Sequence, residues 1–151
     1  MVTGGCGSIG TEIVRQLLNY NPKVIRILER SEAAHFRLSQ EIQSPQLRPL
    51  IGDIRDRSRV DRAMRDIDIV FHAAAMKHVP MCEYNPSEAV SVNVLGTQNL
   101  VESAIERGVK RFIGISTDKA VNPTSTMGAT KLLSEKIITN ASISGGSQIR
   151  F

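Results

Sequence analysis

The chain has 151 residues, enough for one domain with its own core, and its 41% hydrophobic and 23% charged residues are typical of a globular protein. Its net charge of +4 is spread along the sequence without a basic stripe interleaved with aromatic residues, which argues against nucleic-acid binding. No apolar run approaches the roughly 20 residues that span a bilayer, and no secretion signal opens the chain, so we expect a cytoplasmic segment without membrane contact. Cys6 and Cys82 lack metal-ligand spacing, so we expect two free thiols and no metal site.

Apolar runs of strand length alternate with helical patterns along the chain. Strands are expected at Val24–Leu28, Leu47–Ile51, Ile67–Phe71 and Phe112–Ile115. Helices are expected at Glu12–Leu18, Glu32–Ile42, Arg57–Met64, Val90–Arg107 and Gly128–Asn140. This alternation, with strands buried on both faces, predicts an α/β protein with a Rossmann-like, doubly wound parallel sheet and helices on each side.

Both ends of the sequence look cut. Only Met1 and Val2 precede a glycine-rich loop, although a first strand usually needs about five residues. At the other end, Gln148–Phe151 has the pattern of another strand that has just begun. We therefore expect residues 1–151 to be an NAD(P)-binding Rossmann domain, truncated at both ends and derived from a longer protein. Whether that parent protein has a membrane anchor stays open.

The loop TGGCGSIG, which starts at Thr3, has glycines at every third position, and a helix is expected to begin within it. Gly4 permits a tight turn, Gly7 lets the backbone approach a pyrophosphate, and Gly10 lets the helix pack closely on the sheet. The start of the helix then offers free N–H groups and a positive dipole end to the phosphates. The alternative is a plain glycine-rich turn. The residues expected to bind the dinucleotide here are Thr3, Gly4, Gly7, Ser8, Ile9 and Gly10.

Two neighbouring residues at the end of the second strand give opposite indications about the cofactor. Glu29 lies close to the spacing of about 20 residues after the glycine loop at which an acid binds the adenosine ribose hydroxyls. A carboxylate there favours NAD over NADP because it repels a 2′-phosphate. Arg30, next to it, could instead pair with that phosphate. We expect NAD or NADP, with a slight preference for NAD.

Further cofactor contacts are expected after the third and fourth strands. Asp53, in IGDIRD, is placed to accept a hydrogen bond from the adenine amino group, with Ile54 packing on the ring. The fourth strand runs into FHAAA, whose small side chains let the cofactor lie against the backbone. The alanines concerned are Ala73, Ala74 and Ala75. His72 is more typical of a packed core histidine than of a catalyst.

Several motifs together carry a family resemblance. They are TGGCGSIG, the Asp53-Ile54 pair, FHAAA, VNVLGTQN (Val92–Asn99) and STDKAVNPTSTMGATK (Ser116–Lys131). The set resembles the extended short-chain dehydrogenase/reductase family. The stretches FHAAAMKHVPMCEYNPSEAVSVNVLGTQN and STDKAVNPTSTMGATK are more narrowly similar to the CapD-like polysaccharide biosynthesis proteins, which are nucleotide-sugar 4,6-dehydratases acting on UDP-N-acetylglucosamine.

The resemblance implies a redox-neutral reaction on a UDP-sugar. Bound NAD(P)+ would take a hydride from C4, water would leave across C5 and C6, and the hydride would return to C6. The family's C-terminal substrate domain would lie outside this chain, so the isolated chain is expected to be inactive. We also expect a homo-oligomer.

The catalytic candidates lie in STDK and one helix further on. Thr117 offers a hydroxyl at a strand end, where such sheets place their ligands, and Asp118 and Lys119 match the dehydratase positions for the acid and the base. Lys131 is retained to hold the nicotinamide ribose. The alternative for Asp118 and Lys119 is a solvated ion pair in a loop.

Met127 stands where the wider family has its tyrosine base, and a thioether cannot move a proton. The resemblance nevertheless includes CapD-like members with methionine at this place. The group that deprotonates O4 is therefore open between neutral Lys131, Asp118 acting through water, and a substrate phosphate. Tyr84 is a weaker candidate, for which a packing role is expected.

Two rival functions stay open at this point. A 4-epimerase or a simple reductase would use the same scaffold and cofactor. A non-catalytic nucleotide-binding module would bind the cofactor without turnover.

Overall fold

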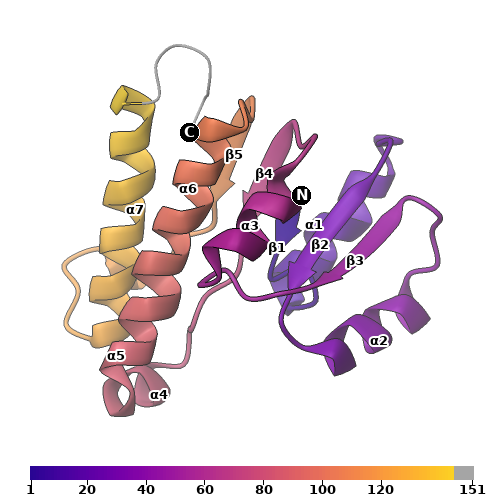
Figure 1. Cartoon of the computed structure of the whole chain (residues 1–151). Coiled ribbons are helices and arrows are strands. Elements are labelled where there is room, and N and C mark those ends of the chain that lie inside the picture. The colour runs from indigo at the N-terminus through magenta and orange to yellow at the C-terminus, as the bar shows by residue number, and fades with distance from the viewer. Residues whose placement is uncertain (145–151) are drawn as a thin grey trace.

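The computed structural model describes residues 1–144, with side chains described through Ala141. At its centre lies a five-stranded parallel sheet of order β3-β2-β1-β4-β5 (Figure 1). The strands are β1 (Val2–Thr3), β2 (Ile25–Glu29), β3 (Leu47–Ile51), β4 (Ile69–His72) and β5 (Arg111–Gly114). The predicted Rossmann-like, doubly wound fold is confirmed. The expected strand at Gln148–Phe151 lies outside the described residues.

The helices follow the predicted order, with differences at their ends. They are α1 (Ser8–Leu18), α2 (Glu32–Glu41), α3 (Arg57–Met64), α4 (Val79–Tyr84), α5 (Pro86–Ala89), the π-helix η1 (Val90–Leu95), α6 (Gly96–Glu106), the 3-10 helix η2 (Asp118–Ala120) and α7 (Thr126–Ser144). The expected uniform helix Val90–Arg107 is wrong in its first part, which is a π-helix preceded by two short helices. The first helix begins at Ser8, within the glycine loop as its pattern predicts, and therefore four residues before the helical periodicity that starts at Glu12.

Strand β1 is central although it is only two residues long. Val2 pairs with Ile27 of β2 on one side and with Phe71 of β4 on the other. Thr3 lies correspondingly beside Leu28 and His72. The sheet order reverses direction at β1, so the carboxyl ends of β1 and β4 form the topological switch point where sheets of this kind bind ligands.

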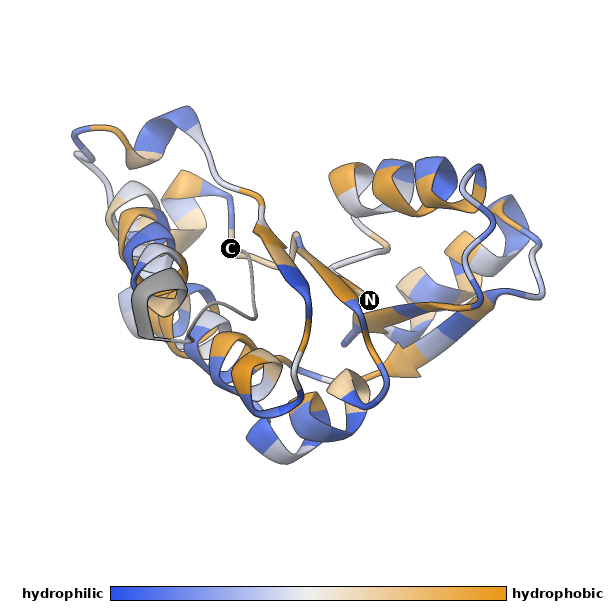
Figure 2. Ribbon diagram, turned by 90° about the horizontal axis from the view of Figure 1, so that it is seen from above, coloured by the Kyte–Doolittle hydropathy of each residue, from blue (hydrophilic) through white to orange (hydrophobic). Residues whose placement is uncertain are grey.

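Helices cover both faces of the sheet. On one face α3, α6 and α7 pack on side chains such as Val70 and Phe112, and on the other α1 and α2 pack on Val2 and Ile27. Figure 2 shows mainly hydrophobic strands between helices whose hydrophilic residues turn outward. The prediction that every strand is buried on both faces is wrong for β3, because it lies at the sheet edge and has an exposed Pro49.

Arg57, at the start of α3, connects this helix to α6. Its guanidinium forms ion pairs with Glu102 and Glu106 of α6, at 2.5 and 2.6 Å, so it ties the two helices together at the surface. None of the helices within residues 1–144 has both the length and the apolar character needed to cross a bilayer.

Candidate active site

The glycine loop has the geometry that its sequence predicts. Gly4 has a φ of +65°, and a Cβ there would lie 2.7 Å from the backbone of Ala74, just after the end of β4. A Cβ at Gly10 would lie 2.2 Å from the carbonyl oxygen of Gly4. The tight turn and the close packing of α1 on the loop therefore both require glycine. A Cβ at Gly7 would meet only the Gly4 oxygen, at 3.4 Å, so Gly7 is not required by contacts within the chain.

The start of α1 differs from those of the next two helices. The Ser31 side chain caps α2 by accepting from the Ala34 N–H, and Asp56 caps α3 by accepting from Arg59. Gly7 occupies the same cap position in α1 and offers no side-chain cap. The first N–H groups of α1 are thus left for another acceptor, and the positive dipole end makes an anion the favoured one.

A cavity of about 260 Å³ opens beside this loop, at the carboxyl ends of β1, β2 and β4. It brings together every predicted cofactor-binding residue except Thr3 and Lys131. Those that line it are Gly4, Gly7, Ser8, Ile9, Gly10, Glu29, Arg30, Asp53, Ile54, Ala73, Ala74 and Ala75. The sequence reasoning missed Leu28, Gly52, Met76, Lys77 and Val92, which also line it. Extending each strand-end motif by one or two residues would have found most of these.

Thr3, which does not line the cavity, is fully buried directly beneath it. Its hydroxyl bonds the His72 ring and accepts weakly from the Ala74 N–H, at 3.4 Å. Thr3 therefore supports the cavity wall and does not form part of its surface.

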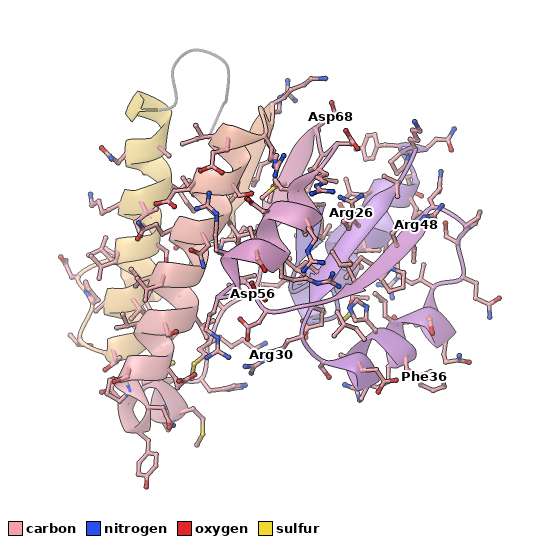
Figure 3. The ribbon with its side chains drawn as sticks, in the orientation of Figure 1. Arg26, Arg30, Phe36, Arg48, Asp56 and Asp68 are labelled. Atoms are coloured by element: carbon pink, nitrogen blue, oxygen red, sulfur yellow. The ribbon has the colours of Figure 1, made fainter. Side chains whose placement is uncertain are left out.

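The part of the cavity wall that follows β2 carries both signs of charge. The Glu29 carboxylate accepts a hydrogen bond from the Ser31 N–H at 3.1 Å, which fixes its direction. Arg30 extends from the turn after β2, and Figure 3 shows it near the same sheet edge as the α3 cap residue Asp56. Glu29, which favours NAD, and Arg30, which could pair with the 2′-phosphate of NADP, thus line the same cavity.

The Asp53 carboxylate is ionised and already forms a salt bridge within the chain. Arg55 holds both of its carboxylate oxygens, with contacts of 3.0 and 2.7 Å, and also reaches Glu88 at 2.7 Å. The hydrogen bonds from Arg55 are the main cause that lowers the pKa of Asp53. An adenine amino group would have to share this carboxylate with Arg55. Ile54 is 5% exposed and belongs to the core as well as to the cavity wall.

The STDK loop follows β5, at the same carboxyl edge of the sheet. Thr117 donates to the Asp118 carboxylate at 3.0 Å, and the Lys119 ammonium lies 3.3 Å from the same oxygen. The side chains of Asp118 and Lys119 are 85% and 54% exposed, so the pair has the form of a solvated loop ion pair. The Thr117 hydrogen bond, followed by Lys119, lowers the pKa of Asp118. The carboxyl is therefore ionised here, whereas a general acid must carry a proton.

Lys131 does not line the glycine-loop cavity. Its ammonium donates to the Ile115 carbonyl at 2.6 Å and is buried beneath the end of β5, and this burial lowers its pKa. It faces a second hollow of about 420 Å³ between β5 and α7, together with Ser116 and Glu135, which hydrogen-bond each other. The structure thus places Lys131 near the STDK loop and apart from the cavity that surrounds the glycine loop.

Met127 points into the protein and away from solvent. It is 4% exposed and packs with Cys82 and Ala89, on the side of α4 and α5. The expected packing role of Tyr84 is wrong, because this residue lies at the end of α4 and is 86% exposed.

The sequence reasoning assigned no role to Asn93, which connects the cavity wall to α7. Its amide accepts from the Met76 N–H at 2.8 Å and donates to the Met76 carbonyl at 3.0 Å. It also donates to the Thr130 hydroxyl at 3.0 Å. The signal was present in VNVLGTQN, since a polar residue amid apolar ones in a buried helix must find partners.

Comparison with known proteins gives a consistent picture. A family model described as polysaccharide biosynthesis protein matches residues 1–151. An uncharacterized membrane protein of Methanocaldococcus jannaschii is 57% identical over 148 residues, which are 98% of this chain and 44% of the relative. A UDP-N-acetylglucosamine 4,6-dehydratase (inverting) of Campylobacter jejuni is 48% identical over 153 residues, which are 100% of this chain and 46% of the relative. Relatives named UDP-glucose 4-epimerase, from Rickettsia, match at 42–43% identity.

Among solved structures, the dTDP-glucose 4,6-dehydratase DesIV from Streptomyces venezuelae, with NAD and TYD bound, superposes with a TM-score of 0.90 at 31% identity. The match covers 99% of this chain and 53% of that one. The chain thus spans about half the length of the relatives it matches.

Proposed function

The chain belongs to the polysaccharide biosynthesis protein family, and on this premise we propose that it is the dinucleotide-binding part of a nucleotide-sugar 4,6-dehydratase that acts on UDP-N-acetylglucosamine. The observation that carries the proposal is the cavity at the switch point, bounded by an uncapped helix start and by the ends of β1, β2 and β4. The Campylobacter relative named for this activity, at 48% identity, supports the choice of reaction and sugar.

The cofactor is NAD or NADP, and we favour NAD. The N–H groups at the start of α1 would hold the pyrophosphate, and Gly7 would let it come close. Glu29, oriented by the Ser31 N–H, would accept from the adenosine ribose hydroxyls and repel a 2′-phosphate. A dehydratase structure that resembles this chain has NAD bound, which supports an adenine dinucleotide as the cofactor. When bound, the dinucleotide supplies the chemistry of hydride uptake from C4 and hydride return to C6.

The chain's own residues would carry out the proton transfers of the reaction. Oxidation at C4 releases a proton from O4, and the resulting ketone acidifies the C5 proton. Loss of that proton and of the C6 hydroxyl, which leaves as water, forms a C5–C6 double bond. Hydride return to C6 and proton return to C5 complete a 6-deoxy-4-keto sugar. Thr117 would hydrogen-bond O4, Lys119 would take the C5 proton, and Asp118 would protonate the leaving hydroxyl.

The acid role of Asp118 demands a change on substrate binding. Its pKa is lowered as long as Thr117 and Lys119 hydrogen-bond it in solvent. A sugar that takes over the Thr117 hydroxyl and excludes water would remove the largest cause of that lowering and raise the pKa. For the O4 proton, neutral Lys131 gains support from its lowered pKa, while Asp118 through water and a substrate phosphate stay as alternatives.

The proposal includes a substrate domain outside this chain and a homo-oligomeric assembly, and it leaves open a membrane anchor. The test therefore uses the full-length gene product. Asp118→Asn and Lys119→Met are expected to abolish dehydration of UDP-N-acetylglucosamine while the dissociation constant for the cofactor stays unchanged. Asp68→Asn and Lys110→Met are the matched controls, because they remove a surface ion pair of 2.6 Å at the opposite end of the sheet. Full dehydration by either STDK variant would refute the assignment.

A 4-epimerase is the second candidate, favoured by the relatives that carry that name. Analysis of the product by NMR separates the two, since epimerisation keeps the C6 hydroxyl and dehydration removes it. A reductase would consume its cofactor in proportion to product. Cofactor binding without turnover on any UDP-sugar would instead indicate a non-catalytic module.

A further inference from the structure

A buried histidine, which borders the second hollow together with Lys131, joins three parts of the fold. His72, at the end of β4, is 3% exposed, and both of its ring nitrogens meet threonine hydroxyls. Nδ1 lies 2.7 Å from Oγ1 of Thr3 on β1, and Nε2 lies 2.9 Å from Oγ1 of Thr97 on α6. Both threonines are buried, at 0% and 1% exposure, so water does not compete for these bonds.

The direction of each hydrogen bond follows from its neighbours. The Thr97 hydroxyl donates its single proton to the Asn93 carbonyl at 2.6 Å, and a carbonyl can only accept. Toward His72, Thr97 must therefore accept, so the proton sits on Nε2. A neutral ring then has a bare Nδ1, which accepts from the Thr3 hydroxyl. Thr3 in turn accepts from the Ala74 N–H.

The charge state of the ring agrees with this order. A protonated ring would also donate from Nδ1, and the Thr3 proton would lose its acceptor. Burial, and after it the positive charge of Lys131, lowers the pKa of His72 to about 3. The ring is thus neutral at physiological pH, and one tautomer satisfies all its neighbours.

Both ends of this chain of hydrogen bonds reach the same segment of the cavity wall. At one end, the Thr3 hydroxyl accepts a weak hydrogen bond of 3.4 Å from the Ala74 N–H. At the other, Asn93 uses its side-chain amide to hold both backbone groups of Met76. The Asn93 carbonyl that Thr97 bonds lies in the π-helix η1 and also accepts from Ser134 of α7, at 2.5 Å. These hydrogen bonds therefore fix the part of the π-helix η1 from which the Asn93 side chain reaches the cavity wall.

We propose that His72 is a positioning residue. In its Nε2–H tautomer it holds the backbone of Ala74–Met76 in the cavity wall and the π-helix η1 at Asn93 in one arrangement before the dinucleotide binds. A plain packing role would require only the ring's volume, and neither the tautomer nor the two hydroxyls would matter. The inference rests on the proposed function in one respect only, which is that the ligand of this wall is an adenine dinucleotide.

Variants at Thr97 test this positioning role without altering the imidazole ring of His72. Thr97→Val keeps the side-chain shape and removes the hydroxyl, whereas Thr97→Ser keeps the hydroxyl. We expect Thr97→Val to raise the dissociation constant for NAD+ about fivefold to tenfold, because it removes the buried hydroxyl that bonds both Asn93 and His72. The dissociation constant of Thr97→Ser for NAD+ should stay within about twofold of that of the parent protein. Val70→Ala, in the core on the same strand, controls for lost stability alone and should leave NAD+ affinity unchanged.

Two readouts do not need a ligand. In protein labelled with [15N]histidine, His72 should show a protonated Nε2 and a bare Nδ1, with shifts that do not change between pH 5 and pH 8. Amide hydrogen exchange at Met76 should accelerate in Thr97→Val and not in Thr97→Ser. An Nδ1–H tautomer, or equal exchange and affinity in the two Thr97 variants, would overturn the proposal. If the parent protein binds no NAD+ while the tautomer and exchange results hold, the proposed function fails and this inference survives.

Discussion

The buried, neutral His72 predicts a specific dependence of stability on pH. In the folded chain its pKa is about 3, mainly because burial penalises the charged ring, whereas in the unfolded chain it returns to 6.5. Between these values the unfolded chain binds more protons than the folded one, so stability rises with pH. The contribution is complete above pH 6.5 and is lost as the pH falls toward 3. At pH 5 the gap from 6.5, at ~1.4 kcal/mol per pKa unit, amounts to a loss of about 2 kcal/mol.

Urea unfolding followed by circular dichroism at pH 8, 7, 6 and 5 measures this effect. His72→Gln removes the titrating group but keeps one donor and one acceptor. The free-energy difference between the parent and the variant isolates His72, because all other titrating groups cancel. We expect the advantage of the parent to shrink by about 2 kcal/mol from pH 8 to pH 5. A difference that stays constant over this range would show that the folded ring titrates normally and would refute the buried, neutral assignment.

Three further substitutions test the site. Met127→Tyr should not improve turnover and should destabilise by about 1–3 kcal/mol, because residue 127 is buried among Cys82 and Ala89; faster dehydration by a stable variant would contradict this. Gly7→Ala should fold normally, since its new Cβ meets only the Gly4 oxygen at 3.4 Å, yet should weaken NAD+ binding about tenfold in calorimetry. An unchanged affinity for NAD+ would refute the proposal that the pyrophosphate binds next to Gly7. Glu29→Ala should move the ratio of NADP+ to NAD+ dissociation constants about tenfold toward NADP+, and tighter NADP+ binding by the parent itself would overturn the preference for NAD.

Local patterns predicted most of the fold. The helix Arg57–Met64 and the strand Leu47–Ile51 have the expected bounds because short periodic runs and turn residues mark them clearly. The glycine pattern indicated that a helix begins in this loop, but not the exact residue, because Gly7 takes the cap position that polar side chains usually occupy. Most of the cavity lining followed from the glycine loop and the strand ends, since parallel strands bring their carboxyl ends to one edge.

Features that depend on distant contacts were not predictable. The π-helix places the Asn93 carbonyl where Ser134, 41 positions later, can donate to it, and no local pattern encodes that distance. The same holds for Met127, whose position in the sequence indicates a catalytic place but whose side chain packs on α4 and α5. The lowered pKa of Asp118 has a local cause, the hydrogen bonds from its neighbours Thr117 and Lys119, but it depends on side-chain directions that the sequence does not specify.

The reaction itself is the most direct test of the account. The full-length gene product would be incubated with its cofactor and UDP-N-acetylglucosamine that carries deuterium at C4, and the product analysed by NMR. We predict a 6-deoxy-4-keto sugar with the deuterium transferred from C4 to C6, and no net consumption of cofactor. A product that keeps its C6 hydroxyl, with the C4 configuration inverted, would contradict the dehydratase and establish the epimerase instead.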